Sequence, residues 1–336
     1  MKKYDVFGIG NALVDCVILV TEKFLEENNI EKGVMTLVDD EKQKSIIEKI
    51  KNSDPFIQSG GSVTNSVYTL SQLGGSGYQS FLISDDEHGK LFLEDLNKSG
   101  INISNESYYL GEGMTGSCLV LTTPDAERTM NTCLAVSSKY SIENINFDDL
   151  AISRYIYIEG YLVTSELAID AIKKSIAFCK KNDVKISLTF SDLSMVKYFK
   201  DKFDEILTEK IDLLFCNKEE ALTFTGESDF DKCCSILLKL SDTVVITNGK
   251  EGSSIITNSQ KIKIKPHQVQ AIDTVGAGDT FAGAFLYGIN NGLDFENAGN
   301  LASKLSSKVV TKLGPRLDKE VIAVSYTHLT LPTTLV

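Results

Sequence analysis

Residues 273–285 of the chain read DTVGAGDTFAGAF. In this segment Gly276, Ala277 and Gly278 stand directly before Asp279, and a run of small apolar residues follows. Residues with almost no side chain leave the backbone N–H groups accessible at the start of a helix, where the unpaired amides and the helix dipole favour an anion. A carboxylate in this position is either a helix cap or a chemical reagent. The segment therefore predicts an anion-binding turn, with Asp279 as the candidate catalytic group.

The composition limits the classes of protein to which the chain can belong. Its 336 residues, of which 42% are apolar, suffice for one large domain with a substantial insertion. The formal net charge of −12 argues against a nucleic acid or an anionic membrane as a partner, because such partners require a basic face. No apolar run approaches the roughly 20 residues of a membrane span, and we expect a cytoplasmic protein. Seven scattered cysteines are typical of a reduced compartment, and three histidines without metal-ligand spacing argue against zinc.

Arginine is rare in this lysine-rich chain and occurs only at positions 128, 154 and 316. Each arginine is therefore a candidate for a specific role, although Arg154 is expected on the surface. Because the chain as a whole is acidic, a small anionic ligand would need such a local positive charge.

Most of the chain alternates short apolar runs with amphipathic stretches. This alternation is typical of a parallel sheet that is covered by helices on both faces. Apolar residues at helical spacing occur over 62–74 and 165–181. We therefore predict an α/β fold with a doubly wound, mainly parallel sheet. The strand candidates are YDVFGIG (4–10), YQSFLIS (78–84), YIYIEG (155–160), VKISLTF (184–190), DLLFC (212–216) and TVVITNG (243–249).

Two segments, 15–38 and 105–135, interrupt this rhythm with strand and turn patterns and hardly any helix. Two such excursions from one α/β domain can pair into a small β-sheet at its rim, where we expect it to act as a lid. The alternative is a simple extension of the edge of the main sheet. The large domain is then predicted to consist of 1–14, 39–104 and 136–323.

The last stretch, VSYTHLTLPTTLV (324–336), is uncharged and rich in threonine, unlike the rest of the chain. We interpret it as a non-native tail. The alternative is a genuine C-terminal strand.

The first glycine motif is GIGNALVD, residues 8–15, at the end of the first predicted strand. A dinucleotide-binding fingerprint would require a third glycine where the chain has Leu13, which argues against a nicotinamide-dependent dehydrogenase. Asn11 and Asp15 remain as two short polar side chains at a strand end. An amide and a carboxylate suit two neighbouring hydroxyl groups of a ligand, although turn capping explains these residues equally well.

The second motif is SGGSVTNS, residues 59–66, where another strand ends and a helix begins. Gly60 and Gly61 allow a ligand to approach the backbone closely, and Asn65 lies about one helical turn later. A plain helix start after a tight turn is the alternative for the glycines. The sequence contains no Walker-type GxxxxGK[ST] loop, so a phosphate group is expected at 276–279 instead.

The third motif is CNKEEALTFTG, residues 216–226, after the strand DLLFC. Asn217 and Glu220 lie three residues apart, on one face of a helix that begins there. Such a sparse pair can hold the water shell of Mg²⁺, which takes few protein ligands. A capping box between the same two residues is the structural alternative.

Together these motifs resemble those of the ribokinase-like family, the PfkB carbohydrate kinases, from Tyr4 to Arg316. DTVGAGDTFAGAF is similar to the most specific signature of that family, NKEE to its N-x-x-E magnesium motif, and SGGSVTNS to its substrate-binding diglycine with the following asparagine. Within the family, the segments 11–15, 115–118 and 128–131 resemble the adenosine-kinase branch.

The resemblance implies an ATP-dependent kinase that phosphorylates the 5′-hydroxyl of a nucleoside, adenosine in particular. The alternative within the family is a kinase of a free sugar such as ribose or fructose, with the same machinery. Asp279 would accept the hydroxyl proton, while the amides of 276–279, Mg²⁺ and Arg128 stabilise the transferred phosphoryl group. Outside enzymes, the alternative is a ligand sensor with this fold, against which Asp279, Asn217 and Glu220 argue.

The resemblance also implies the remaining site residues. The substrate pocket would include Asn11, Asp15, Gly60, Gly61, Asn65, Met35, Leu37, Cys118, Met130 and Tyr161. ATP would contact Asn217, Thr247, Gly249, Gly276, Gly278 and Ser303, with 294–312 as the late nucleotide-binding helix. A monovalent cation such as K⁺ is expected near Asp273. With the small-molecule substrate and ATP as its partners, the protein is expected to be a monomer or a homodimer.

Overall fold

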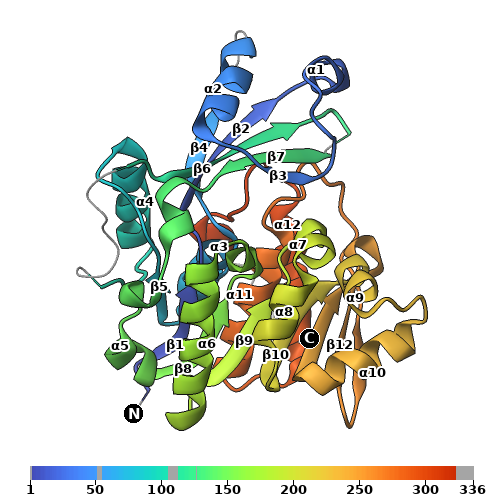
Figure 1. The fold of residues 1–336 in the computed structure, drawn as a ribbon. Coiled ribbons are helices and arrows are strands. Elements are labelled where there is room, and N and C mark those ends of the chain that lie inside the picture. The colour runs from blue at the N-terminus through green and yellow to red at the C-terminus, as the bar shows by residue number, and fades with distance from the viewer. Residues whose placement is uncertain (1, 51–54, 105–112, 126, 323–336) are drawn as a thin grey trace.

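A large twisted sheet forms the centre of the computed structural model, which describes residues 2–50, 55–104, 113–125 and 127–322 (Figure 1). In this part of the chain, eight strands pair in the order β13-β12-β11-β10-β9-β8-β1-β5. The pairs from β5 to β11 are parallel, and β12 and β13 continue the sheet in antiparallel fashion. The strands are β1 (Tyr4–Ile9), β5 (Gly77–Ser80), β8 (Ser153–Ile158), β9 (Lys185–Thr189), β10 (Ile211–Asn217), β11 (Ser241–Thr247), β12 (Ser253–Thr257) and β13 (Lys261–Ile264).

Helices cover both faces of this sheet, as the sequence predicts. In β8, Ile156 and Ile158 pack into one apolar core, while Tyr155 and Tyr157 pack into the other, because successive side chains of a strand point to opposite faces. The first core is closed by α5 (Phe147–Ala151), α6 (Glu166–Lys181), α7 (Leu193–Tyr198), α8 (Lys200–Ile206), α9 (Lys218–Thr225) and α10 (Phe230–Leu240). The second core is closed by α3 (Ser62–Gln72), α4 (Glu87–Lys98), α11 (Ala277–Asn290) and α12 (Phe295–Val309).

Short 3-10 helices occupy several connections between these elements. They are η1 (Ala135–Lys139), η2 (Ile142–Asn144), η3 (Gly160–Thr164) and η4 (Gly249–Glu251). The helices predicted over 62–74 and 165–181 are confirmed as α3 and α6.

A second, smaller sheet stands at one end of the large sheet, at the top of Figure 1. Among the described residues it has five strands in the order β3-β7-β6-β2-β4. Its outer face packs against two helices through Leu25 and Ile46, so its inner face is left to cover the end of the large sheet. The elements are β2 (Leu13–Leu19), β3 (Met35–Leu37), β4 (Phe56–Gly60), β6 (Gly116–Thr122), β7 (Arg128–Cys133), α1 (Glu22–Glu27) and α2 (Asp40–Lys49).

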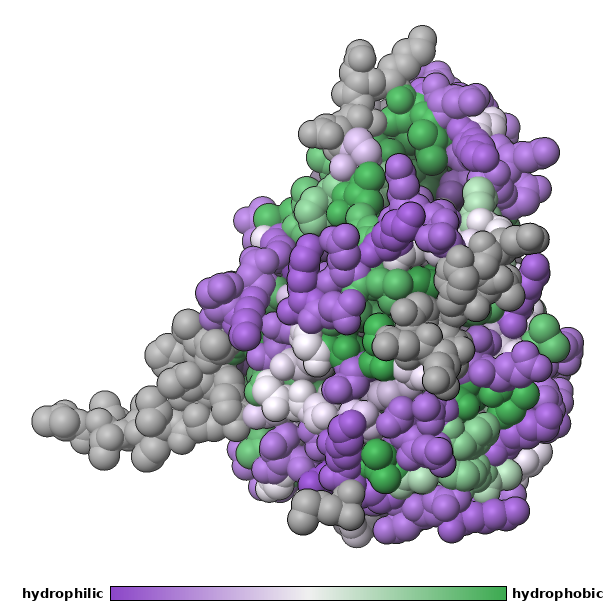
Figure 2. Space-filling view, turned by 90° about the vertical axis from the view of Figure 1, so that its left-hand side faces the viewer, coloured by the Kyte–Doolittle hydropathy of each residue, from purple (hydrophilic) through white to green (hydrophobic). Residues whose placement is uncertain are grey.

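The small sheet is larger than the sequence analysis predicts. Residues 39–60 were expected in the large domain, but β4 pairs antiparallel with β2, and α2 packs on the small sheet. The strand pattern of β4 is weak because it lies at the edge of the sheet, with Phe56 and Ile57 exposed to solvent. Apolar side chains are visible at the surface of this upper part of the molecule in Figure 2.

Two very short linkers connect the sheets. Residues 10–12 alone join β1 to β2, and Gly61 alone joins β4 to α3. Gly61 has a φ of +92°, and a Cβ atom on it would lie 2.4 Å from the carbonyl oxygen of Asn11. The two linkers therefore pass in close contact, and only glycine fits at position 61.

Parts of the sequence analysis fall outside the described residues. They are the segment 324–336, which we interpret as a non-native tail, and residues 105–112 of the predicted lid. Within the described ranges, no helix combines the length and the apolar character needed to cross a membrane.

Candidate active site

A cavity of about 320 Å³ lies between the small sheet and the large sheet. Its lower wall is formed at the carboxyl ends of the parallel strands β1, β8, β9, β10 and β11 and at the start of α11, which is where open α/β sheets bind ligands. Most of the predicted site residues line it: Asn11, Asp15, Met35, Leu37, Gly61, Asn65, Cys118, Arg128, Met130, Tyr161, Asn217, Glu220, Thr247, Gly276, Ala277, Gly278 and Asp279.

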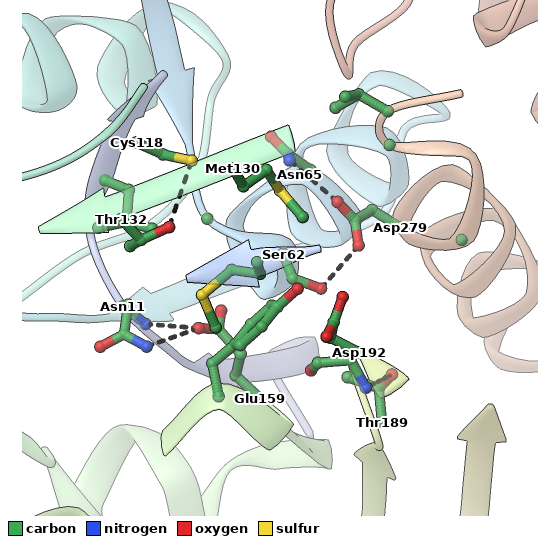
Figure 3. Close-up of a pocket in the computed structure, with 18 of the residues that line it drawn as sticks. Asn11, Ser62, Asn65, Cys118, Met130, Thr132, Glu159, Thr189, Asp192 and Asp279 are labelled. Atoms are coloured by element: carbon green, nitrogen blue, oxygen red, sulfur yellow. Dashed lines mark hydrogen bonds between the residues drawn. The ribbon is translucent and has the colours of Figure 1, made fainter. Parts of the chain in front are cut away.

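Asp279 is held by the neighbouring helix α3. Its Oδ1 accepts a hydrogen bond from the Ser62 hydroxyl at 2.6 Å, and its Oδ2 accepts one from Nδ2 of Asn65 at 3.0 Å (Figure 3). Burial raises the pKa of Asp279 to about 6, although these two hydrogen bonds and the charge of Arg128 act in the opposite direction. The carboxylate is therefore oriented, and its pKa lies near neutrality, as suits a general base.

The start of α11 differs from an ordinary helix start because no side chain caps it. Gly276 is the N-cap residue, with a φ of +67°, and Asp279 is the third residue of the helix. A Cβ atom on Gly276 would lie 2.2 Å from the carbonyl oxygen of Pro315, whereas a Cβ atom on Gly278 would meet no described atom within 4 Å. Gly276 is thus required by the fold, and the space beside Gly278 opens into the cavity, where an anion can reach the amides.

Arg128 brings a positive charge from the small sheet into the cavity. Its Nε lies 2.8 Å from Oδ1 of Asp273, and its buried Nη2 has no hydrogen-bond partner among the described residues. Asp273 is fully buried and also accepts hydrogen bonds from the backbone N–H groups of Val275 and Gly314, at 3.0 Å and 2.9 Å. The structure thus gives Asp273 a guanidinium as its counter-ion, where the sequence analysis expects a monovalent cation.

Asp15 is a buried carboxylate that faces the cavity. Its side chain is 7% exposed and has no hydrogen-bond partner among the described residues. Burial raises its pKa to about 7. The adjacent Gly60 does not line the cavity, and a Cβ atom there would lie 2.3 Å from the carboxylate of Asp15. The predicted role of Gly60 is therefore indirect, because it makes room for Asp15.

Asn11 does not cap a turn but is bound by a residue that the sequence analysis missed. Its backbone N–H and its Nδ2 donate to Oε1 of Glu159, at 3.2 Å and 2.9 Å, and Oε2 of Glu159 accepts from the backbone N–H of Val63 at 3.1 Å. Burial raises the pKa of Glu159 to about 7. Glu159 directly follows β8. Polar side chains at the ends of parallel strands often form binding sites, so this position is a sequence signal that could have identified Glu159.

The inner face of the small sheet is mostly apolar. Met35 of β3 pairs with Met130 of β7, and Cys118 of β6 pairs with Asp15 of β2. Val120 extends this apolar surface along β6. The cavity therefore has a polar floor and an apolar roof, with Asp15 at the boundary.

Asn217 and Glu220 form the capping box that was the structural alternative. Asn217 accepts from the N–H of Glu220 at 2.8 Å and donates its own N–H and Nδ2 to the Glu220 carboxylate, at 2.9 Å and 2.6 Å. A carboxylate has about four acceptor positions, so Glu220 keeps capacity toward the cavity. Burial raises its pKa to about 7. Because Glu220 is buried at the cavity wall, the pair fits a Mg²⁺ ion that is bound through water.

Two expected contacts lie elsewhere. Gly249 belongs to η4 and Ser303 to α12, and neither lines the cavity. Ser303 donates a hydrogen bond to the carbonyl oxygen of Lys265, at 3.1 Å. These positions follow from the family resemblance by spacing alone, and spacing does not determine which side of an element faces the cavity.

The cavity also contains residues without a sequence signal. Asp192 lines it after β9 and caps α7 through the backbone N–H of Ser194, at 2.7 Å. Ser62 directly follows the glycine pair, but its hydroxyl contact with Asp279 joins residues far apart in the chain.

Comparisons with known proteins agree with this geometry. A model of the pfkB family carbohydrate kinases matches residues 35–321. Adenosine kinase from Saccharomyces cerevisiae is 24% identical over 339 residues, which cover 94% of this chain and 98% of that protein. A 5-dehydro-2-deoxygluconokinase from Clostridium botulinum is 28% identical over 273 residues, which cover 75% of this chain and 78% of that protein. The crystal structure of adenosine kinase from Sinorhizobium meliloti matches with a TM-score of 0.92 at 29% identity, covering 97% of this chain and 99% of that chain.

Proposed function

The chain belongs to the pfkB family of carbohydrate kinases and is therefore a phosphotransferase, and on this premise we propose that it transfers the terminal phosphoryl group of ATP to the 5′-hydroxyl of adenosine. Cytoplasmic location and a monomeric or homodimeric state stay predictions from the sequence.

In this proposal Asp279 accepts the proton of the attacking hydroxyl. The Ser62 and Asn65 hydrogen bonds fix the direction of its carboxylate. A pKa of about 6 leaves Asp279 mostly ionised at neutral pH, yet close enough to neutrality for efficient proton transfer. The new O–P bond forms as the bond to the ADP oxygen breaks, and the proton of the hydroxyl passes to Asp279.

The transferred phosphoryl group needs charge stabilisation in a dry site. Among the amides of 276–279, that of Ala277 donates to the carbonyl oxygen of Thr274 at 3.3 Å, and the others supply backbone donors. Nη2 of Arg128, which has no partner among the described residues, supplies a charged one. Mg²⁺, held through water at Asn217 and Glu220, would neutralise phosphate charge. We propose that the small sheet acts as the lid that excludes water from this reaction, because Arg128, Met130 and Asp15 reach the cavity from it.

The observation that carries the nucleoside assignment is the buried Asp15 carboxylate at the edge of an apolar roof. A buried carboxylate that accepts no hydrogen bond from the described residues suits the vicinal hydroxyl groups of ribose, because each O–H can donate to it. The apolar surface of Met35, Met130 and Val120 suits a flat base, which a free sugar lacks. Hydroxyl groups all around a free sugar would remain without partners at this roof.

A gluconate kinase is the second candidate, because one of the relatives acts on 5-dehydro-2-deoxygluconate. Such a substrate carries a carboxylate and requires a cation beside it. Among the described residues that line the cavity, Arg128 is the only lysine or arginine, and in this proposal its Nη2 is used by the transferred phosphoryl group. The charge of the pocket thus favours the nucleoside.

A coupled assay of ADP release tests the proposal on purified protein with ATP·Mg²⁺. We expect adenosine to give a kcat/KM at least roughly tenfold above that of ribose, fructose and 5-dehydro-2-deoxygluconate, in keeping with the specificity that unpaired polar groups impose. Asp15→Asn is the matched variant, and it should raise the KM for adenosine much more than the KM for ATP. Turnover of a free sugar or sugar acid above that of adenosine would overturn the nucleoside assignment and leave the kinase assignment intact.

A further inference from the structure

Arg316 is a buried cation next to the candidate base, in the segment that follows α12. Its side chain is 7% exposed, and its Nε donates to Oδ1 of Asn65 at 2.8 Å. Its Nη1 pairs with Asp95 of α4, and its guanidinium lies 4.8 Å from the ring centre of Tyr68. Three neighbours therefore hold the guanidinium in one orientation against Asn65.

The chain of contacts continues from Asn65 to Asp279. The amide of Asn65 uses its oxygen for Arg316 and its Nδ2 for Oδ2 of Asp279, at 3.0 Å. Asn65 is 3% exposed, so water does not replace either contact. Asp95, Arg316, Asn65 and Asp279 thus form one relay, in which Arg316 and Asn65 are buried and Asp279 is the proposed general base.

We infer that Arg316 is a positioning residue that fixes the amide orientation of Asn65 and thereby keeps Asp279 in its proton-accepting form. This inference rests on the proposed function. An arginine can only donate hydrogen bonds, so the amide oxygen of Asn65 must face it. The amide N–H groups then face Asp279, and donors toward a carboxylate favour its ionised form.

Without Arg316 the amide of Asn65 is free to turn. Its oxygen would then face Asp279, and an acceptor in that position favours the protonated carboxyl, which cannot act as a base. The charge of Arg316 acts in the same direction, since it is among the causes that lower the pKa of Asp279 against burial. The other ionisable groups around Asp279 are Asp15, Arg128, Tyr157, Glu159 and Tyr161.

The test compares Arg316→Met and Arg316→Lys with the wild type over pH 5–9. In Arg316→Met we expect the acid limb of the kcat profile to move up by about one pH unit, so that kcat falls roughly fivefold at pH 6 and recovers toward pH 8. Arg316→Lys should show a smaller shift in the same direction, because the ammonium keeps the charge but not the fixed geometry of the guanidinium. The KM for ATP should stay within about twofold in both variants, since the relay does not touch the amides of α11.

Tyr68→Phe is the matched control. It keeps the ring below Arg316 but removes the hydrogen bond from the Tyr68 hydroxyl to the carbonyl oxygen of Leu317, at 3.0 Å. This variant loosens the same segment without changing the relay, so its pH profile should equal that of the wild type. A similar shift in Tyr68→Phe would mean that Arg316 acts only through the stability of the segment.

A double-mutant cycle with Asn65→Leu tests the order of the relay. Once Asn65 is gone, only the direct effect of the Arg316 charge should remain, so Arg316→Met should change kcat less than it does in the wild type, whereas the effects of independent residues would add. The pKa of Asp279 can also be read in the free protein, by NMR of 13C-labelled aspartate carboxyl groups assigned with Asp279→Asn. If the wild type phosphorylates no tested hydroxyl, the proposed function fails while this pKa still tests the relay. An unchanged pKa in Arg316→Met would overturn the inference, and so would an unchanged value in Arg316→Lys if the Met variant did not fold.

Discussion

The helices α9 and α11 begin at the same edge of the large sheet, and each carries an acidic residue at its third position, Glu220 and Asp279. In α9 the N-cap is Asn217, and Glu220 closes a capping box with it. In α11 the N-cap is Gly276, which has no side chain, and Asp279 instead accepts hydrogen bonds from α3. The start of α9 is thus capped by its own side chains, whereas the start of α11 has no side-chain cap among the described residues.

The difference shows that the position of an acid in a helix does not determine its role. What decides is where its hydrogen-bond donors come from. Glu220 receives two from Asn217, three residues earlier, and becomes part of the cap. Asp279 receives its donors from another helix, so the amides of α11 stay available to an anion.

The largest effect is expected for Asp279→Asn. Asparagine can accept from Asn65 and donate to the Ser62 oxygen, so both contacts with α3 survive and the protein should fold. The proton acceptor is lost, and kcat should fall by at least about 100-fold while ATP·Mg²⁺ still binds. Rapid-quench kinetics and calorimetric titration with ATP measure the two quantities. Near-normal turnover would mean that Asp279, like Glu220, has a structural role and is not the base.

A smaller effect is expected for Gly278→Val, which fills the open space beside the amides of α11. Because a Cβ atom there meets no described atom within 4 Å, the fold should be kept while the Kd for ATP rises by roughly tenfold, the typical cost of losing charge-assisted hydrogen bonds. Gly276→Val is the contrasting variant, since its Cβ atom would clash with Pro315, and it should lower the melting temperature instead. Equal Kd values for Gly278→Val and the wild type would show that the open helix start binds no phosphate.

At α9 we expect a loss of stability. Asn217→Ala removes the cap and should lower the free energy of unfolding by about 1 kcal/mol, while Asn217→Ser, another good N-cap, should recover most of it. Urea denaturation of the three proteins measures this. The Mg²⁺ concentration for half-maximal activity should rise in both variants, because serine restores the cap but not the amide at the proposed ion site. If the Mg²⁺ concentration for half-maximal activity rose in Asn217→Ala but not in Asn217→Ser, the rise would be due to the loss of the helix cap.

The smallest effect is a pH dependence at Glu220. Its folded-state pKa is raised from 4.5 to about 7 by burial, so the folded protein binds the proton more tightly than the unfolded chain does. The stabilisation from the protonated form is complete below about pH 4.5 and is lost as the pH rises through about 7. Glu220→Gln keeps a capping side chain without this charge, so its stability relative to the wild type should rise between pH 5 and pH 8, by on the order of 1 kcal/mol. A relative loss of stability over this range would contradict the buried state of Glu220.

The sequence predicts most of the architecture because the parallel strands are buried on both faces and form clear apolar runs. It predicts that a strand ends near Gly60, but not that this strand, β4, joins the small sheet, because its exposed edge position leaves no alternating pattern. For the site, strand ends and glycine pairs identify Asn11, Asp15 and Asp279. The contacts of Arg316 and Ser62 are beyond such reasoning, because they depend on segments that only the folded chain brings together.

The order of strands in the small sheet has a consequence for how the protein acquires its structure. The central strands β6 and β7 come from the second excursion of the chain and lie between β3 and β2, which come from the first. Before residues 116–133 have been synthesised, β3 has no neighbour, and β2 can pair only with β4. Strands that are so far apart in the sequence pair slowly, and their pairing cannot begin early on the ribosome. Neither excursion can fold as an independent unit, so the roof of the cavity should form late and cooperatively, and it cannot be transplanted to another scaffold as one continuous fragment.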